Sequence, residues 1–364
     1  MRFLLFADLH LDAPFQWARP ELARARRQAL RETLKRICVV AHEQQVDAIL
    51  SAGDLYENER FSADTAEFLR ATFAEVDLPV YLAPGNHDWF GAGSLYRQVK
   101  WSPNVHLFTT NRLTPVELSD GVTLWGAGHL APANTGGFLD EFRVDRGGLN
   151  LALFHGSEVG ELAFQGSDKA PHAPFHTARI PEAGLAHAFV GHYHSPRDAD
   201  WHTYPGNPDP LSFGETGDRA AVLVDVGAEG RVTRTRIAVG VSEVHDVDVD
   251  LSGVTHSDQV LDRVRAATSG LGGIARVTLA GELAADVDVR VADVANLAGV
   301  VKLVPRLGRI SRAYDFDAIA TEPTVRGRFV ADVLAADLDD ESRRRVLITG
   351  LRAFDGRAAD LEVI

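Results

Sequence analysis

Five short clusters of aspartate, histidine and asparagine contain the residues in this sequence that could do chemistry. In chain order they are Asp8-Leu9-His10, Gly53-Asp54, Gly85-Asn86-His87-Asp88, His155-Gly156 and Gly191-His192-Tyr193-His194. Imidazole, carboxylate and amide oxygen are ligands for divalent metals such as Mn²⁺, Fe²⁺ and Zn²⁺. Taken singly, each cluster is better explained by turn chemistry or by an ordinary hydrogen-bonded histidine than by a site. Together and in this order, they predict a metal site.

Short apolar runs precede these clusters and predict the strands that would carry them. The runs are Arg2–Ala7, Asp47–Ala52, Val80–Ala83, Val122–Trp125, Asn150–Phe154 and His187–Val190. Apolar runs of this length are typical of strands covered on both faces. Amphipathic stretches at Glu21–His42 and Ser62–Glu75 predict helices between the first three strands. The alternation predicts a layered α/β fold with a largely parallel sheet, whose strand ends bring the clusters to one edge.

A change in residue composition near residue 240 divides the chain into a domain of residues 1–240 and a smaller domain of residues 241–364. Twelve of the 14 histidines lie before this boundary. Ala220–Val226 and Arg231–Val239 predict a hairpin that closes the sheet of the first domain. The elements expected beyond the boundary are strands at Val244–Leu251 and Ile274–Ala280, and helices at Asp258–Thr268, Arg328–Ala336 and Asp340–Phe354. The second domain is therefore expected to be α+β.

The composition excludes several classes of protein. A single cysteine, Cys38, excludes a disulfide framework and a cysteine-based zinc cage. The sequence has no stretch of eighteen apolar residues, and Asp8 interrupts the first apolar run too early for a signal peptide, so we expect a cytoplasmic protein without a membrane span. The net charge of −14 argues against a polyanion-binding protein with a wholly basic surface.

The ordered clusters resemble the motifs of the calcineurin-like metallophosphoesterase superfamily, over about residues 1–240. Within that superfamily, Val105–Phe108, Thr203–Pro208 and Leu211–Glu215 resemble segments of the SbcD/YhaO-type DNA repair exonucleases. The resemblance implies a layered metallophosphoesterase β-sandwich flanked by helices. It also implies a two-metal phosphodiesterase, acting as a DNA exonuclease or endonuclease in end processing and repair.

The resemblance further implies which residues hold two divalent ions. Metal one would be bound by Asp8, His10, Asp54 and His194, and metal two by Asp54, Asn86, His155 and His192. The family implies Mn²⁺, with Fe²⁺ or Zn²⁺ as alternatives. Metals roughly 3.5–4 Å apart lower the pKa of a bridging water towards about 7, and this water would attack the phosphodiester.

Two further residues of the third cluster are expected to be catalytic. His87 would be the general acid or transition-state donor, and Asp88 would orient its ring, unless Asp88 is a turn-capping carboxylate. Many of these nucleases carry a histidine shortly after the Gly-Asp motif, whereas Leu55–Arg60 has none. This departure leaves the balance between exonuclease and endonuclease open, with Arg60 as the nearest cation for phosphate contact.

The resemblance implies DNA, an SbcC-like coiled-coil ATPase subunit and a second copy of the chain as partners, with nucleoid association on DNA. The chain has no Gly-x-x-x-x-Gly-Lys-Ser/Thr loop of its own. Arg328–Ala336 and Asp340–Phe354 are the expected docking element for the ATPase, or else domain core. Trp89-Phe90 is expected either to stack on an unpaired base or to pack under a loop. Two groups of basic residues are expected on solvated helix faces, with a track for DNA phosphates as the alternative: Arg24, Arg26, Arg27, Arg31, Lys35, Arg36 and Arg343–Arg345.

Two other classes of function remain open from the sequence alone. One is a phosphatase or phosphodiesterase that acts on a small phosphate ester, and the other is a partner-binding scaffold. The complete ligand set disfavours the scaffold. The second domain and the segment from Pro205 to Glu215 disfavour the small substrate.

Overall fold

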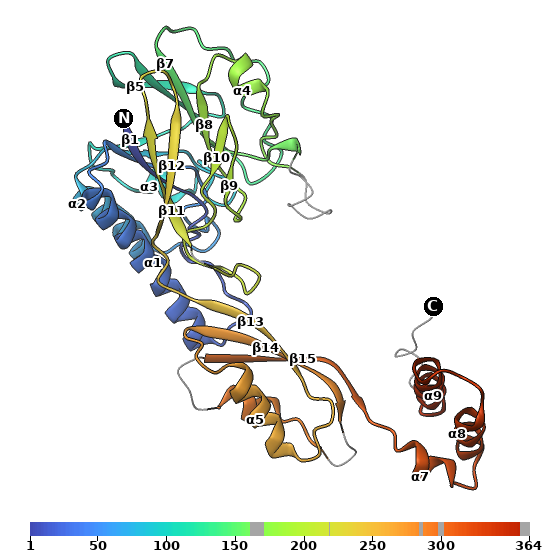
Figure 1. Ribbon diagram of the computed structural model, residues 1–364. Helices are drawn as coiled ribbons and strands as arrows, with labels where there is room; N and C mark the ends of the chain where they lie inside the picture. Colours follow the sequence, from blue (N-terminus) through green and yellow to red (C-terminus); the bar gives the residue numbers. More distant parts are fainter. Residues whose placement is uncertain (161–170, 218, 284–286, 298–301, 357–364) are drawn as a thin grey trace. The chain divides into compact units, whose positions relative to one another are not determined.

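The computed structural model describes residues 1–160, 171–217, 219–283, 287–297 and 302–356. The chain divides into two compact units, Met1–His245 and Asp246–Ile364, which run from blue to yellow and from orange to red in Figure 1. The boundary expected from the sequence is residue 240. Among the described residues, no helix is both long enough and apolar enough to span a membrane.

The first sheet of the first unit runs in the order β12-β11-β1-β2-β3-β4. Its strands are β1 (Arg2–Phe6), β2 (Ala48–Ser51), β3 (Val80–Leu82), β4 (Val105–Leu107), β11 (Ala220–Val226) and β12 (Val232–Ala238). β1 to β4 pair in parallel, whereas β11 runs antiparallel to β1 on its other side, with Leu4 opposite Leu223. The expected hairpin, β11–β12, therefore forms an edge of this sheet.

The second sheet runs in the order β5-β6-β7-β8-β10-β9. Its strands are β5 (Thr114–Ser119), β6 (Val122–Gly126), β7 (Leu149–His155), β8 (His187–Gly191), β9 (Arg197–Asp198) and β10 (His202–Tyr204). β6, β7, β8 and β10 are parallel to one another, and β5 and β9 pair antiparallel at the two edges. The strands predicted as one parallel layer are thus divided between two sheets.

Apolar side chains from the inner faces of the two sheets form one core. Phe3 and Leu5 of β1 pack in the same cluster as Leu151 and Leu153 of β7 and Phe189 of β8. The rings of Phe3 and Phe189 meet edge to face, with their centroids 6.1 Å apart. This packing is that of a β-sandwich, as the family resemblance implies.

Two long helices cover the outer face of the first sheet. α1 (Pro20–Glu43) begins with a proline in its first turn, and α2 (Ala63–Val76) begins after Ser62, whose hydroxyl accepts a hydrogen bond from the amide of Thr65 at 3.2 Å. Leu30 of α1 and Leu69 of α2 pack on Leu4 and Ile49 of the sheet. The short helices α3 (Leu95–Gln98) and α4 (Arg179–Glu182) lie in the connections.

One residue of α1 corrects the expected solvated face. Arg26 is only 2% exposed, and its guanidinium donates to Asp209 Oδ1 at 2.6 Å. Asp209 is fully buried and also accepts from the hydroxyl of Thr33 and the amides of Val241 and Ser242. Placing Arg26 on the polar face was therefore wrong, because a buried carboxylate from a distant loop neutralises its charge.

The second unit contains a small three-stranded sheet and a group of helices. The sheet has the order β13-β14-β15, from β13 (Val244–Asp250), β14 (Ile274–Leu283) and β15 (Lys302–Arg312). The helices are α5 (Ser257–Ala267), α6 (Val291–Ala295), α7 (Phe316–Ala320), α8 (Val325–Ala335) and α9 (Asp340–Phe354). Val260 and Val264 of α5 pack on Val277 of β14. Val330 of α8 and Leu347 of α9 form a separate small core with Ile319.

Candidate metal centre

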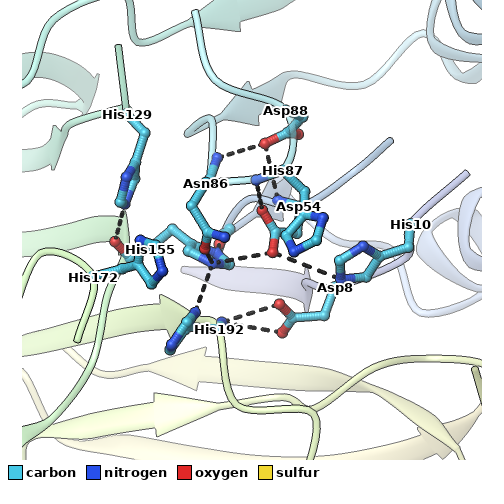
Figure 2. A network of polar contacts seen from close by, with 12 residues as sticks. Asp8, His10, Asp54, Asn86, His87, Asp88, His129, His155, His172 and His192 are labelled. Carbon is cyan, nitrogen blue, oxygen red and sulfur yellow. Dashed lines mark hydrogen bonds and ion pairs between the residues drawn. The ribbon is translucent and has the colours of Figure 1, made fainter. Parts of the chain in front are cut away.

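The predicted ligands follow the carboxyl ends of strands from both sheets and meet at one place (Figure 2). Asp8 and His10 follow β1, Asp54 follows β2, and Asn86 follows β3 of the first sheet. His155 is the last residue of β7, and His192 directly follows β8 in the second sheet. The site is therefore assembled where the two sheets of the sandwich come together.

The backbone at several of these residues adopts left-handed conformations that residues other than glycine rarely take. Asp8, His10, Asp54 and His192 have φ angles of 56°, 50°, 52° and 115°. Backbone hydrogen bonds hold two of the loops together, from the Asp8 amide to the Gly53 carbonyl at 3.0 Å and from the His10 amide to the Asp54 carbonyl at 2.9 Å. Strained backbone of this kind concentrates at functional sites, where the surrounding structure enforces it.

Two glycines allow the loops to approach so closely. Gly53 has a φ of 95°, and a Cβ atom there would lie 2.7 Å from His155 Nδ1. A Cβ atom on Gly85 would collide with the Asp54 carboxylate. Both motif glycines are needed because ligand side chains occupy the space that their own side chains would fill.

The first group of candidate ligands is Asp8, His10 and His194, whose ligand atoms lie within 4.8 Å of one another. His10 Nδ1 donates to Glu57 Oε1 at 2.7 Å, and His194 Nδ1 donates to Glu215 Oε1 at 2.9 Å. A carboxylate only accepts hydrogen bonds, so each neutral ring carries its proton on Nδ1 and leaves Nε2 with a free lone pair. His10 Nε2 is buried without a hydrogen-bond partner and lies 3.6 Å from Asp54 Oδ2.

The second group surrounds His155. Its Nδ1 donates to the carbonyl of Ala52 at 2.9 Å, so the neutral ring again presents a lone pair at Nε2. That Nε2 atom lies 3.0 Å from Asn86 Oδ1, 3.3 Å from Asp54 Oδ2 and 3.3 Å from His192 Nδ1. Burial and the neighbouring His155 lower the pKa of His192 to about 2, so its ring is neutral and able to bind a metal.

The arrangement of these acceptors fits a cation. Carboxylate oxygens, an amide oxygen and imidazole lone pairs converge, and only a proton or a metal ion compensates their mutual repulsion. Burial lowers the pKa of His155, but the charge and hydrogen bond of Asp54, together with Asp8 and the Ala52 carbonyl, raise it to about 9. Divalent ions compete with protons for such nitrogens. The residues present therefore fit a dinuclear centre in which Asp54 lies between the two groups.

The structure places ligand atoms of His87, His10 and Asp54 within 4.8 Å of one another, and it gives the His87 ring a different partner from the one expected. His87 Nδ1 donates to Glu57 Oε2 at 3.0 Å, and the side chain is 46% exposed. Burial lowers the pKa of His87, but the hydrogen bond to Glu57 and nearby carboxylates raise it to about 9. The expectation that Asp88 orients this ring was therefore wrong, because the His87 ring contacts Glu57 and the hydrogen bonds of Asp88 go to other groups.

Asp88 instead organises the loops beneath the ligands. It is fully buried and accepts hydrogen bonds from the amides of Asp54, Leu55 and Gly85 and from the hydroxyl of Tyr96. Burial, followed by the charge of Asp54, raises the pKa of Asp88 to about 6. These contacts match the alternative expectation of a loop-capping carboxylate.

Two carboxylates that were not among the predicted site residues, Glu57 and Glu215, contact the predicted ligands His10 and His194. Each had a signal: Glu57 lies three residues after Asp54, and Glu215 ends the segment Leu211–Glu215. Glu215 is held in turn by the side-chain amide of Asn207 and the backbone amide of Leu211, both at 2.6 Å. Carboxylates behind metal-binding histidines fix the ring orientation and strengthen the ligand.

The aromatic and basic residues considered for DNA contact have neighbours within the protein. Phe90 packs against the core between the first sheet and helices α1 and α2, and the Arg97 guanidinium lies over its ring at 4.7 Å. These contacts match the alternative in which Phe90 is packed. Trp89 is half-buried. Arg343 pairs with Asp340, and Arg344 pairs with Glu282.

The fold and the site define a family. The calcineurin-like phosphoesterase family matches residues 1–209, which is more than half of the chain, and the chain belongs to this family. Its members use a dinuclear metal centre, and the candidate ligand groups of this chain fit such a centre. The expected layered fold is thereby confirmed.

Two curated relatives give a finer comparison. The uncharacterized metallophosphoesterase YhaO of Bacillus subtilis (strain 168) is 28% identical over 265 residues, covering 68% of this chain and 61% of that protein. The DNA double-strand break repair protein Mre11 of Methanopyrus kandleri is 28% identical over 305 residues, covering 73% of this chain and 62% of that protein. The chain thus spans about three fifths of the length of these relatives.

Solved structures are more distant. The protein TT1561 of Thermus thermophilus is 16% identical with a TM-score of 0.39, over 65% of this chain and 98% of that chain. A dimetal phosphatase from Danio rerio is 13% identical with a TM-score of 0.40, over 66% of this chain and 96% of that chain.

Proposed function

We propose that this chain is a two-metal nuclease that cleaves phosphodiester bonds in DNA during end processing and repair. The observation that carries the proposal is the place of Asp54. Its Oδ2 lies 3.6 Å from His10 Nε2 of one ligand group and 3.3 Å from His155 Nε2 of the other. A carboxylate between two groups of metal ligands would help to hold both ions of a two-metal centre, an arrangement that many phosphodiester-cleaving enzymes use.

The surrounding residues have separable tasks in this proposal. When bound, two divalent ions supply Lewis acidity and a water of lowered pKa. Asp8 and Asp54 contribute two negative charges against four positive ones, so the centre keeps a positive charge that attracts a phosphate diester. His87, whose pKa is raised to about 9, holds a proton for the leaving oxygen on a ring that is 46% exposed to substrate.

DNA is favoured as substrate by the similarity to a relative named as a DNA double-strand break repair protein. The test is cleavage of end-labelled DNA and of a simple aryl phosphodiester by the purified protein in Mn²⁺, with Asp54→Asn as control. Cleavage of DNA by the wild type alone supports the proposal. Cleavage of the aryl ester but not DNA indicates a small substrate, and cleavage of neither indicates a scaffold.

The second unit suggests where an SbcC-like ATPase subunit would bind. Val330, Leu347 and Leu351 are buried in the core of α7–α9, whereas Val325, Val346 and Phe354 are 77%, 40% and 46% exposed. We propose these exposed apolar residues as the docking element. Replacing Val325 and Phe354 by aspartate should abolish co-purification with that subunit without unfolding the helices, and undiminished binding would contradict the proposal.

DNA binding itself should depend weakly on salt. With a net charge of −14, few phosphates can be neutralised outside the metal centre. The logarithm of the affinity should therefore fall gently with the logarithm of the salt concentration, because the slope counts neutralised phosphates. A slope matching six to ten phosphate contacts would indicate a basic face elsewhere.

A further inference from the structure

One carboxylate in the site contacts two histidines with different assigned tasks. Glu57 Oε1 accepts from Nδ1 of His10 at 2.7 Å, and Glu57 Oε2 accepts from Nδ1 of His87 at 3.0 Å. The two rings lie edge to face, with centroids 4.7 Å apart. The side chain of Glu57 is 17% exposed, compared with 4% for His10 and 46% for His87.

The backbone around Glu57 is tied to the loops that carry both histidines. The Glu57 amide donates to the carbonyl of Leu11, next to His10, at 2.9 Å. The amide of the following residue, Asn58, donates to the carbonyl of His87 at 2.9 Å. The Glu57 carboxylate therefore starts from a fixed point between two loops, and little conformational freedom is lost when it binds both rings.

This arrangement sets the tautomer of both rings. Because Glu57 only accepts hydrogen bonds, each ring must present Nδ1–H to it and turn Nε2 away. For His10, Nε2 then faces Asp54 Oδ2 at 3.6 Å, on the side of the candidate metal centre. For His87, Nε2 becomes the nitrogen that is available to a substrate.

We infer that Glu57 is a shared positioning residue, which orients His10 for metal binding and His87 for proton donation. The inference rests on the proposed two-metal phosphodiesterase function. Loss of the Glu57 carboxylate should have two separable effects. One contact acts on His10, a predicted metal ligand, and the other acts on His87, which is not among the predicted ligands. A purely structural carboxylate would lower stability without either effect.

The test uses the nearly isosteric variant Glu57→Gln in the full-length protein. Glutamine keeps one acceptor oxygen, but its NH₂ group opposes the Nδ1–H of one ring. His87→Asn, the double variant and Glu59→Gln complete the set. Glu59 is an exposed carboxylate two residues further on and is the matched control.

The first readout is Mn²⁺ binding, followed by electron paramagnetic resonance without substrate. Glu57→Gln should weaken binding at one site by about 10–100-fold, the usual cost of losing the carboxylate behind a ligand histidine. His87→Asn and Glu59→Gln should bind as the wild type does. Unchanged Mn²⁺ binding in a folded Glu57→Gln protein would overturn the inference.

The second readout is single-turnover cleavage at saturating Mn²⁺. If Glu57 acts through His87, adding Glu57→Gln to His87→Asn should slow cleavage by less than about two-fold further, because the two changes remove one shared function. Rate losses that multiply would overturn this half of the inference. If the wild type cleaves neither substrate, the proposed function fails, and the Mn²⁺ titration alone decides whether Glu57 positions His10.

Discussion

The two units of the chain differ in whether they bury polar and charged residues. The first unit fully buries Asp8, Asp88, His155 and Asp209. In the described part of the second unit, Thr268 is the only buried polar residue, and its hydroxyl donates to the Val264 carbonyl of its own helix. The charged pairs of that unit lie towards the surface, such as Arg276 with Asp246 and Arg328 with Asp332.

This difference shows where the sequence is constrained by chemistry. Burying a charge costs free energy unless it is paired, so a protein keeps buried charges where they serve a purpose. In the first unit they converge on the metal centre or join distant segments. In the second unit, substitution of surface charges should be tolerated, and any binding role would depend on exposed side chains.

The largest effect should follow from removing the residue between the two ligand groups. Asp54→Ala should abolish hydrolysis and deplete bound metal, because both groups lose a ligand. Elemental analysis and single-turnover cleavage measure these two outcomes. Asp332→Ala, in an exposed ion pair of the second unit, is the control and should change neither. Full metal content in Asp54→Ala would require a new ligand assignment.

His87→Asn should give the next largest effect on the reaction. The metals should remain bound, whereas cleavage should slow by about 10²–10⁴-fold, the usual contribution of a positioned proton donor. By contrast, Asn86→Ala should weaken one metal, and excess Mn²⁺ should restore part of its activity. Loss of a metal from His87→Asn, or cleavage at the wild-type rate, would remove His87 from its assigned role.

Two arginines, one in each unit, allow the stability contributions of a buried and an exposed ion pair to be compared. Arg26→Ala leaves the buried Asp209 without its cation and should lower the free energy of unfolding by about 3–5 kcal/mol. Arg276→Ala breaks an exposed pair and should cost no more than about 1 kcal/mol. Urea denaturation followed by circular dichroism measures both. Equal costs would mean that burial does not distinguish the two units.

A smaller effect than the loss of Arg26 should be a dependence of the stability of the first unit on pH. Burial and the nearby Arg234 lower the pKa of His187 to about 3, from an ordinary value of 6.5. Between these values the unfolded chain binds the proton and the folded chain does not, so stability falls as the pH falls. From pH 7 to pH 5, His187 should account for about 2 kcal/mol of lost stability.

Tryptophan fluorescence measures this effect in the first unit, because all five tryptophans precede residue 202. His187→Gln should flatten the pH dependence of the urea midpoint. The exposed His256→Gln in the second unit should leave it as in the wild type. A similar pH dependence in His187→Gln and the wild type would contradict the assignment.

Much of the first unit could be predicted because its strands are short, apolar and followed by polar clusters. β1 was expected at Arg2–Ala7 and lies at Arg2–Phe6, and α2 was expected at Ser62–Glu75 and lies at Ala63–Val76. The division into two sheets was not visible, because apolar runs do not encode which strands pair. β15 was not predicted, since Pro305, Gly308 and several arginines interrupt its apolar pattern.

The candidate ligands were found from their residue types, whereas the residues that hold them were not. Glu57 acts on His87 across 30 residues, and Glu215 acts on His194 across 21 residues. Arg26 was assigned to solvent because its buried partner, Asp209, lies 183 residues away. Such partners are determined by the tertiary fold, so local spacing could not reveal them.

The central place of β1 also has a consequence for how the chain is made. β1 leaves the ribosome long before β11, the neighbour that it pairs with, in which Val224 lies opposite Phe3. At 5–20 residues per second, synthesis of the intervening chain takes roughly 10–45 s. Throughout that time one edge of a very apolar strand lacks its partner, and such an edge favours aggregation. A nascent chain of this protein should therefore depend on chaperones until β11 emerges from the ribosome.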